Sequence, residues 1–340
     1  MEKYENKGLT GLANLGNTCF LNSTLQCLSH TYCFNDFLDK KSYEKKLNKK
    51  YDSLILIEWD KLRQMMWKEN CIISPGKFVN TIRKVAQAKQ RYLFTGFAQN
   101  DLPEFLSFLL ECFHESINRE VIMNINGNIE NSKDELAVKS YTMYKNMYAK
   151  DYSEILDIFY GIHVSRVLSK DKNQTYSEVP EAYFLLSLPI PNKKDVTLMD
   201  CFDEYTKAET LEGENQYQTD AGEKVDALRE IKFWNLPNIL VIDLKRFSNT
   251  NKKNKKYVEF PLEELNLSKY VIGYKKKYIY DLYGICNHGG NVSGGHYTSY
   301  VKNANGFWYH FNDTHVQKVM ENELITNKAY CFFYKKREDQ

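Results

Sequence analysis

The chain has 340 residues, of which 43% are hydrophobic, 26% charged and 14% aromatic, so low-complexity and wholly disordered proteins are excluded. The 46 Lys and Arg residues against 44 Asp and Glu residues leave a net charge of +2, which excludes the strongly basic balance of a nucleic-acid or anionic-membrane binder. The length suits either two domains or one large domain with several lobes.

The first residues, MEKYENKGLTGLANLG, contain no apolar run after their charges. No stretch of about 20 apolar residues follows anywhere in the chain. We therefore expect an intracellular protein without a signal peptide or a membrane-spanning helix. The eight cysteines are scattered and form no CxxC pair, which argues against a disulfide framework and a thiolate metal site. Most of them are expected to be buried free thiols.

A helix is predicted to begin at Cys19, after the glycine-rich segment 11–16. Its apolar face is formed by Leu21, Leu25 and Leu28. Asn17 and Thr18 precede it as candidate caps. A cysteine in the first helical turn has its sulfur near unpaired backbone N–H groups and the positive end of the helix dipole, and both favour the thiolate. Cys19 is therefore a candidate nucleophile.

A competing interpretation is that Cys19 is a small buried hydrophobe, as Cys27 and Cys33 are expected to be. One cysteine cannot separate the two interpretations. The choice depends on which residues elsewhere in the chain lie beside it.

Another helix is predicted over residues 102–118. Its apolar face is formed by Leu102, Phe105, Leu106, Leu109, Leu110, Phe113 and Ile117. Asp101 and Glu104 are spaced as a capping box at its start. The Asn-rich stretch 118–134 is predicted to be a linker between helices. The Lys-rich stretches 40–50 and 249–257 are predicted to be solvated loops.

The C-terminal part contains β-rich runs at 278–285, 297–301, 307–311 and 329–334, separated by Gly and Asn loops. They predict a mostly antiparallel sheet, and hence an α+β chain. His296 begins one predicted strand and Asn312 ends the next. If one ring nitrogen of His296 faces Cys19 and the other is held by Asn312, the three residues form the nucleophile, base and orienting group of a cysteine protease. His288 is expected to be structural.

Two long motifs carry a family resemblance. The segment GLANLGNTCFLNSTLQCL resembles the first box of the ubiquitin-specific proteases, which are papain-like deubiquitinating enzymes, and NHGGNVSGGHYTSYVK with WYHFNDTHV resembles the second. Between them, FTGFAQNDLPEFLSFLL, LLSLPIP and LPNILVIDLKRF resemble further family segments. The match runs from about residue 8 to residue 334.

The resemblance implies a papain-like α+β fold shaped like a right hand, within a single catalytic domain covering residues 1–340. A helical thumb is expected over about 8–118. An antiparallel palm sheet and a fingers sheet are expected over about 150–334. The implied activity is thiol-dependent hydrolysis of the peptide or isopeptide bond after the C-terminal glycine of ubiquitin. The expected partners are ubiquitin and ubiquitinated proteins, without nucleic acid or membrane, and the chain is expected to act as a monomer in the cytoplasm or the nucleus.

The resemblance also assigns the catalytic roles. Cys19 is the nucleophile, His296 the general base and Asn312 the orienting residue. Asn14 matches the asparagine that donates to the oxyanion, a role that the chemistry requires because charge develops on the carbonyl oxygen during attack. Asp313 has a possible secondary role in the same region.

The substrate-binding residues implied by the family are Gln99, Asp101, Glu104, Phe247 and Tyr297. The family's aspartate at the position of Asp101 binds the basic tail of ubiquitin, which a carboxylate suits through charge-assisted hydrogen bonds. The family's second glutamine is replaced here by Asn100. Phe247 and Tyr297 match aromatic positions that line the channel for the tail.

The clearest departure from the family concerns its zinc-binding fingers. Two CxxC pairs hold zinc in many members, whereas this chain has Thr219 and Gly222 at the positions of one pair and no cysteine in SRVLSKDKNQTYSEV. We therefore expect no cofactor and no structural metal. Two alternative functions remain open: a hydrolase for a ubiquitin-like modifier, and a weakly active or inactive ubiquitin-binding module.

Overall fold

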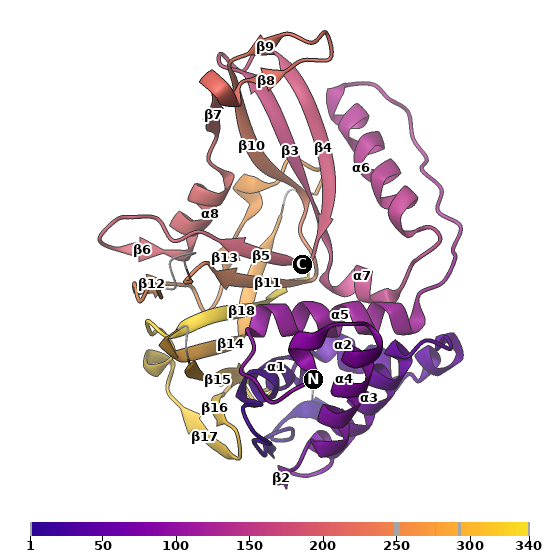
Figure 1. The fold of residues 1–340 in the computed structure, drawn as a ribbon, viewed down its shortest axis with the longest axis vertical. Helices are drawn as coiled ribbons and strands as arrows, with labels where there is room; N and C mark the ends of the chain where they lie inside the picture. Colours follow the sequence, from indigo (N-terminus) through magenta and orange to yellow (C-terminus); the bar gives the residue numbers. More distant parts are fainter. Residues whose placement is uncertain (1, 248–251, 276, 292–293, 339–340) are drawn as a thin grey trace.

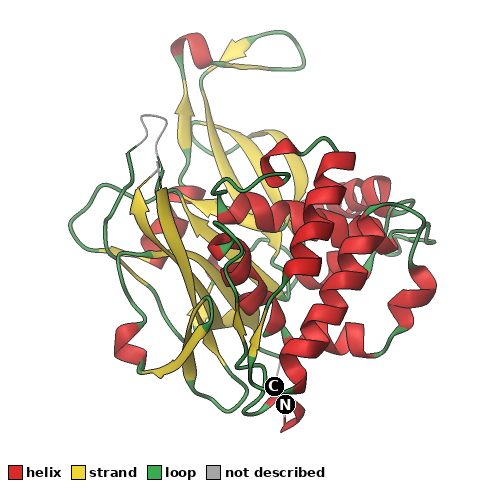
Figure 2. Cartoon of the chain, turned by 60° about the horizontal axis from the view of Figure 1, so that its bottom comes forward, coloured by secondary structure: helices red, strands yellow, loops and turns green. Residues whose placement is uncertain are grey.

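The computed structural model describes residues 2–247, 252–275, 277–291 and 294–338 (Figure 1). Helices from the N-terminal third gather on one side, and the C-terminal strands form a sheet beside them (Figures 1 and 2). A narrower sheet extends away from both. These parts are the thumb, palm and fingers of a papain-like α+β fold, as expected from the sequence.

The thumb is built from α1 (Cys19–Ser29), α2 (Tyr32–Asp39), α3 (Asp52–Lys68), α4 (Gly76–Ala88), α5 (Leu102–Ile117), the 3-10 helices η1 (Glu2–Tyr4), η2 (Ser42–Lys46) and η3 (Tyr92–Phe94), and the parallel pair β1 (Gly11–Leu12) and β2 (Ile72–Ile73). Every residue of α1 is buried. The reason is its position, since α1 packs on α5 of the thumb and on three palm strands, β14 (Ile279–Asn291), β15 (Gly294–Lys302) and β16 (Trp308–Asn312). The predicted helix at Cys19 is confirmed, and it lies where the thumb meets the palm.

The palm is an eight-stranded sheet in the described part of the chain. Its order is β17 (His315–Val319), β16 (Trp308–Asn312), β15 (Gly294–Lys302), β14 (Ile279–Asn291), β18 (Ala329–Lys336), β11 (Ile239–Leu244) and β5 (Leu185–Leu188), with β13 (Leu265–Asn266) also on β14. All neighbours are antiparallel except β11 and β5. The four predicted C-terminal strands are thus confirmed.

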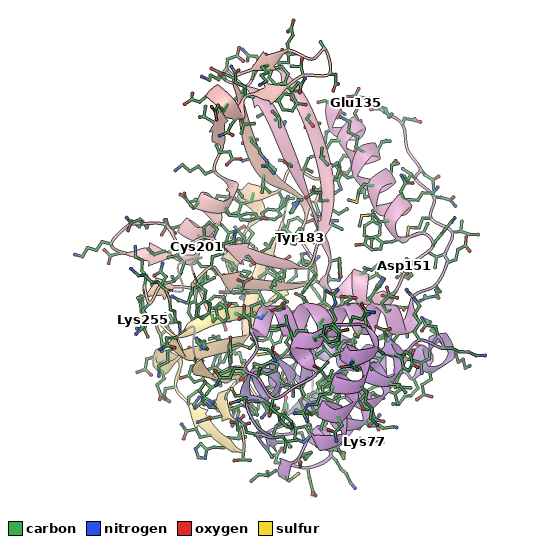
Figure 3. All side chains as sticks on the ribbon, viewed as in Figure 1. Lys77, Glu135, Asp151, Tyr183, Cys201 and Lys255 are labelled. Carbon is green, nitrogen blue, oxygen red and sulfur yellow. The ribbon has the colours of Figure 1, made fainter. Side chains whose placement is uncertain are left out.

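The fingers contain a four-stranded sheet in the order β4 (Thr175–Tyr183), β3 (Gly161–Ser169), β10 (Ala227–Asn235) and β7 (Glu209–Leu211), a hairpin of β8 (Tyr217–Gln218) and β9 (Lys224–Val225), and η4 (Gly213–Asn215). α6 (Ser132–Tyr148) packs along β4 (Figure 1). Tyr183 lies at the base of the fingers, where β4 reaches the palm (Figure 3). The remaining elements are α7 (Glu154–Phe159), α8 (Leu198–Thr206), β6 (Val196–Thr197), β12 (Val258–Glu259), η5 (Ser268–Tyr270) and η6 (Glu321–Glu323).

Two apolar cores lie on opposite faces of the palm sheet. Because side chains alternate along a strand, Cys286 of β14 packs with the thumb helices, whereas its neighbour Ile285 packs in the core that contains α8. Burying both faces holds the palm firmly against α1. No helix in the described residues is long and apolar enough to cross a membrane.

Three local expectations from the sequence are wrong. Thr18 is the N-cap residue of α1, but its side chain makes no capping bond and its Oγ1 accepts instead from the N–H of Leu15 at 2.9 Å. Asp101 is the N-cap residue of α5 and also makes no side-chain capping bond, so the predicted capping box with Glu104 is absent. The linker ends earlier than residue 134, because α6 already begins at Ser132.

Two further expectations need correction. All eight cysteines are free, but Cys33 and Cys71 are only partly buried. The Lys-rich stretch 40–50 is not simply solvated, since Lys46 pairs with Glu154 and Lys50 with Glu115. The second Lys-rich stretch, 249–257, lies partly outside the described residues, and in its described part Lys253 binds His288 and Lys256 donates to the carbonyl of Pro191.

Candidate active site

Cys19 is the first residue of α1 and is 3% exposed. Burial raises the pKa of its thiol above the ordinary value, and the backbone N–H groups of Tyr297 and Phe20 oppose this increase. The sequence predicted the helical N–H contribution but not the larger effect of burial. A neighbouring proton acceptor is therefore needed for Cys19 to act as a thiolate near neutral pH.

His296 follows Gly294 and Gly295 in β15, and Asn312 is the last residue of β16, so the two lie at neighbouring strand ends. Nε2 of His296 lies 2.6 Å from Oδ1 of Asn312. With Nε2–H donated to this oxygen, Nδ1 is the unprotonated nitrogen. The backbone of the next residue, Tyr297, reaches Cys19. Cys19 and His296 are therefore brought to one site from opposite ends of the chain.

Asp313 adjoins this pair but points elsewhere. Its Oδ1 accepts from Nδ2 of Asn22 at 2.7 Å, and its Oδ2 accepts from Nδ2 of Asn14 at 3.0 Å. Oδ2 is 4.0 Å from Nε2 of His296. The backbone at Asp313 is left-handed, with φ of +52°, because the strand ends there in a tight turn. The carboxylate is thus bound by two asparagine amides and does not replace Asn312 at the ring.

The side chain of Asn14 makes two sets of hydrogen bonds. Its Oδ1 accepts from the backbone N–H groups of Gly16 and Thr18, both at 3.1 Å, and so holds the loop that leads into α1. Its Nδ2 donates one hydrogen to Asp313. Because an amide nitrogen carries two hydrogens, the second hydrogen of Nδ2 is left for another acceptor.

Asp101 is bound by two tyrosines rather than by its own helix. Tyr297 donates its hydroxyl to Oδ1 at 3.1 Å, and Tyr330 donates to Oδ1 at 2.9 Å with Oδ2 at 3.0 Å. Burial raises the pKa of Asp101, and the two hydroxyls act in the opposite direction. The carboxylate therefore forms part of a polar wall shared with β15 and β18.

A cavity of about 260 Å³ is lined by Gln99, Asn100, Asp101, Phe247, His288, Asn291 and Tyr297. It contains four of the five substrate-binding residues expected from the sequence. Gln99 also holds β15, because its side-chain amide donates to the carbonyl of Gly295 at 3.0 Å and accepts from its N–H at 2.9 Å. Glu104 lies outside this cavity, on an adjoining groove of about 680 Å³ between segment 90–100 and α5.

The fingers hold together by other means than cysteine ligands. Thr219 and Gly222 form the turn of the β8–β9 hairpin, where the N–H of Gly222 donates to the carbonyl of Thr219 at 2.8 Å. Lys170 pairs with Asp226 at 2.8 Å, which ties β3 to the chain before β10. Nearby, Tyr176 and Tyr217 stack with ring centroids 5.8 Å apart.

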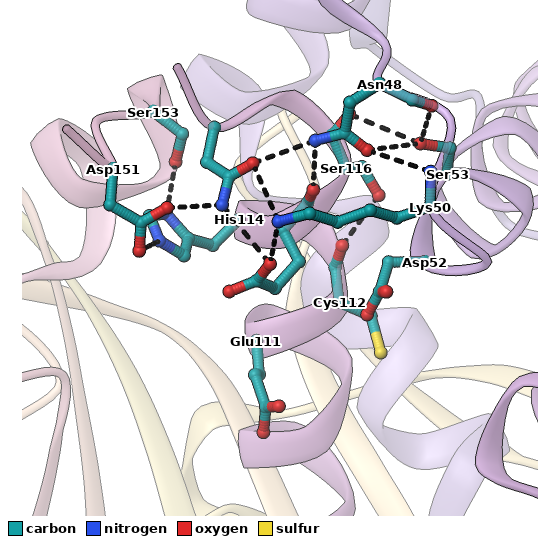
Figure 4. Close-up of polar contacts among 12 residues, drawn as sticks. Asn48, Lys50, Asp52, Ser53, Glu111, Cys112, His114, Ser116, Asp151 and Ser153 are labelled. Atoms are coloured by element: carbon teal, nitrogen blue, oxygen red, sulfur yellow. Dashed lines mark hydrogen bonds and ion pairs between the residues drawn. The ribbon is translucent and has the colours of Figure 1, made fainter. Parts of the chain in front are cut away.

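One group of potential metal ligands occurs in the described residues, where the thumb helix α5 meets the segment before α7. Ligand atoms of His114, Glu115 and Asp151 are within 4.8 Å of one another. They already bind protein groups: Nδ1 of His114 lies 2.8 Å from Oγ of Ser153, and Lys50 donates to Glu115 (Figure 4). The cluster joins the end of α5 to the segment before α7, which is a sufficient structural role.

Two residues of the site are not predicted by the sequence. Asn22 binds Asp313, and Tyr330 binds Asp101. Asn22 follows Cys19 by one helical turn, so an asparagine buried in an apolar helix was an available signal. Tyr330 had no local signal, because it reaches Asp101 only through the packing of β18.

Comparisons with known proteins identify the family of the chain. The family model described as ubiquitin carboxyl-terminal hydrolase matches residues 10–334. Ubiquitin carboxyl-terminal hydrolase 2 of Bos taurus is 34% identical over 349 residues, which cover 98% of this chain and 56% of that protein. Ubiquitin carboxyl-terminal hydrolase 21 of Homo sapiens is 32% identical over 353 residues, covering 96% and 61%. The chain thus spans little more than half the length of these relatives.

Solved structures give the same result. A chain of the SAGA DUB module of Ubp8, Sgf11, Sus1 and Sgf73 bound to monoubiquitin matches with a TM-score of 0.76 and 26% identity, over 100% of this chain and 71% of that one. The module bound to ubiquitin aldehyde matches with a TM-score of 0.75 and 25% identity, over 99% and 71%. Together with the family model over residues 10–334, these matches establish that the chain belongs to the ubiquitin carboxyl-terminal hydrolase family.

Proposed function

We propose that the chain is a single catalytic domain that hydrolyses the peptide or isopeptide bond after the C-terminal glycine of ubiquitin. The observation that carries the proposal is the position of Tyr297. Its backbone N–H reaches Cys19, its hydroxyl binds Asp101, and its ring lines the 260 Å³ cavity. A substrate tail held in this cavity against Asp101 would end beside the candidate nucleophile.

In the proposed mechanism, Nδ1 of His296 takes the proton of the Cys19 thiol, and the sulfur attacks the carbonyl carbon of the terminal glycine. The negative charge that develops on the carbonyl oxygen is stabilised by the side-chain N–H of Asn14. Asn312 accepts from Nε2–H throughout and keeps the ring in the required tautomer.

Collapse of the tetrahedral intermediate expels the amine of the target protein, which receives the proton from His296. Ubiquitin remains bound to Cys19 as a thioester. His296 then removes a proton from water, the resulting hydroxide attacks the thioester, and the Cys19 thiolate leaves. Free ubiquitin and the starting enzyme are regenerated.

Asp101 supports ubiquitin as the substrate. The expected ubiquitin tail, Leu-Arg-Leu-Arg-Gly-Gly, is basic and extended, and a carboxylate at the cavity wall suits its arginines by charge-assisted hydrogen bonds. The free state of all eight cysteines supports action inside the cell, where thiols stay reduced. We also infer that the chain works as a monomer on protein conjugates, and that it needs neither nucleic acid nor a membrane.

The test is to incubate the protein with ubiquitin that carries an electrophilic C-terminus, in parallel with electrophilic ubiquitin-like modifiers. Labelling of Cys19 by ubiquitin alone supports the proposal. Labelling by a ubiquitin-like modifier in preference to ubiquitin reassigns the substrate, and absence of labelling by any of them identifies an inactive binding module. Cys19→Ala is the matched control, which should bind ubiquitin without being labelled.

A further inference from the structure

Lys253 contacts two residues of the cavity wall, Phe247 and His288. It forms an isolated antiparallel bridge with Phe247, one of the residues that line the cavity. Its Nζ donates to the carbonyl oxygen of His288 at 2.5 Å and lies 2.9 Å from Nδ1 of the same residue. A lysine thus holds both the backbone and the ring of His288, which the sequence predicted only as a structural histidine.

His288 forms the centre of this wall. It is 4% exposed, and its ring lies 4.7 Å from that of Tyr297 and 5.4 Å from that of Phe247. Burial lowers its pKa to about 4, and the positive charges of Lys253 and His296 act in the same direction. The ring is therefore neutral near pH 7. Burial also lowers the pKa of Lys253, to about 8, so Nζ is still mainly an ammonium group near pH 7. Because an ammonium group only donates, Nδ1 accepts, and the remaining proton is on Nε2.

The Nε2 edge of His288 supports the backbone that carries His296. A Cβ atom added to Gly295 would lie 2.1 Å from Nε2 of His288 and 2.6 Å from the carbonyl oxygen of Gly289. The N–H and the carbonyl of Gly295 are both bound by Gln99. Gly295 is therefore clamped between Gln99 and His288, so a displacement of the His288 ring would be transmitted directly to the next residue, His296.

We propose that Lys253 is a positioning residue: it holds His288 against Gly295 and thereby fixes both His296 and the wall that receives the substrate tail. The inference rests on the proposed function of Cys19 and His296. It also explains how a cation can lie beside a cavity for a basic tail, since Nζ binds His288 and its charge adds to the effect of burial in keeping that histidine neutral.

The removal of Lys253 has a specific electrostatic consequence. The groups whose positive charge opposes protonation of His288 are Lys253 and, when it is protonated, His296. Asp101 lines the same cavity with a carboxylate, and Tyr297 and Tyr330 face His288 with aromatic rings. Without Lys253, His288 should bind a proton at higher pH, because one of the two opposing charges is gone. A charged His288 would repel the arginines of the substrate tail and disturb Gly295.

The test compares Lys253→Met, which keeps much of the stem and loses the charge, with Lys255→Met as the matched control. Lys255 is exposed and lies in the same segment, at the edge of the molecule (Figure 3). Hydrolysis of a ubiquitin C-terminal amide is measured across pH, at a temperature where both variants are folded. We expect Lys253→Met to lower kcat/KM about tenfold and to move its acid limb to higher pH, while Lys255→Met stays within about twofold of the wild type.

A spectroscopic measurement separates positioning from general loss of stability. In the wild type, the ring nitrogens of His288 should give the NMR signature of an unprotonated Nδ1 and a protonated Nε2. The signature should change in Lys253→Met and return in Lys253→Arg, which restores the positive charge. A kcat/KM within about twofold of the wild type in Lys253→Met, or an equal loss in Lys255→Met, would overturn the inference. An unchanged acid limb together with unchanged His288 signals would overturn it as well.

Failure of the inference and failure of the proposed function give different results. If the wild type does not hydrolyse the ubiquitin amide, the proposed function fails, and the inference fails with it. If the wild type is active and Lys253→Met matches it, only the role of Lys253 is wrong.

Discussion

Nε2 of His296 lies 2.6 Å from Oδ1 of Asn312 but 4.0 Å from Oδ2 of Asp313, although the two residues are adjacent in the chain. We therefore predict that Asn312→Ala lowers kcat for a ubiquitin substrate by at least about tenfold and does so more strongly than Asp313→Ala. The reason is that only Asn312 fixes the tautomer of His296. Steady-state kinetics on folded variants of matched melting temperature decide the order, and a larger loss in Asp313→Ala would transfer the orienting role to Asp313.

Alkylation of Cys19 by iodoacetamide tests whether His296 activates the buried thiol. Burial raises the pKa of Cys19, so the isolated thiol would ionise only at alkaline pH. In the wild type, His296 can accept the proton, which allows reaction near neutral pH. We predict that His296→Ala slows alkylation of Cys19 about tenfold or more near pH 7 and moves its pH dependence upward. Equal rates in the two proteins would show that His296 does not activate the sulfur. The control is His315→Ala, which removes an exposed histidine three residues after Asn312.

Asp101→Asn tests whether the negative charge of Asp101 takes part in binding the substrate tail. The carboxylate accepts from Tyr297 and Tyr330 and makes no capping bond, so an asparagine oxygen can still accept while the charge is lost. We predict a loss of about tenfold in kcat/KM for ubiquitin substrates and little change in melting temperature. Tyr330→Phe, which keeps the charge and removes one donor, should be the milder variant. An unaltered kcat/KM in Asp101→Asn would leave the residue without a role in binding the tail.

The fingers offer a test by metal removal. Lys170 pairs with Asp226 and Tyr176 stacks on Tyr217, so these parts of the fingers are joined by an ion pair and an aromatic contact. We predict that the purified protein contains no stoichiometric zinc and that chelators change neither its melting temperature nor its activity. Tyr217→Ala should instead lower the free energy of unfolding by about 1 kcal/mol, because the stacked pair is lost. Elemental analysis that finds one zinc per chain would contradict this prediction.

Acid should destabilise the fold through His30. The residue is 1% exposed, its Nδ1 lies 3.0 Å from the carbonyl oxygen of Gln26, and burial lowers its pKa to about 4. The unfolded chain, with a histidine pKa near 6.5, binds more protons than the folded protein between these values. Stability should therefore fall as pH drops from about 6.5 to about 4, by up to roughly 3 kcal/mol from this residue.

Denaturant titrations at several pH values measure this effect. His30→Leu should flatten the acid slope of the free energy of unfolding, whatever its effect on stability at neutral pH. His315→Leu, at an exposed position, should keep the slope. The same slope in all three proteins would assign acid sensitivity to other groups.

The sequence by itself determined the elements that depend on local pattern. The start of α1 at Cys19 follows from the glycine-rich segment before an apolar helical face. The β-rich runs between Gly and Asn loops likewise predict the end of β16 at Asn312 and place His296 near the start of β15, which begins two residues earlier than predicted, at Gly294. Two long motifs also sufficed to identify the family. These features can be predicted without knowing which residues far apart in the chain contact one another.

The tertiary structure decided the partners of the polar groups. Local spacing predicted that Asp101 caps α5, but two tyrosine hydroxyls from distant palm strands outcompete the backbone for its carboxylate. The links from Lys253 through His288 to Gly295 likewise join residues that come together only when β14 and β15 pair in register. The burial of Cys19 also depends on tertiary structure. The pKa of its thiol rises because α1 is enclosed by the other thumb helices and the palm, and the spacing of residues within the helix does not show this.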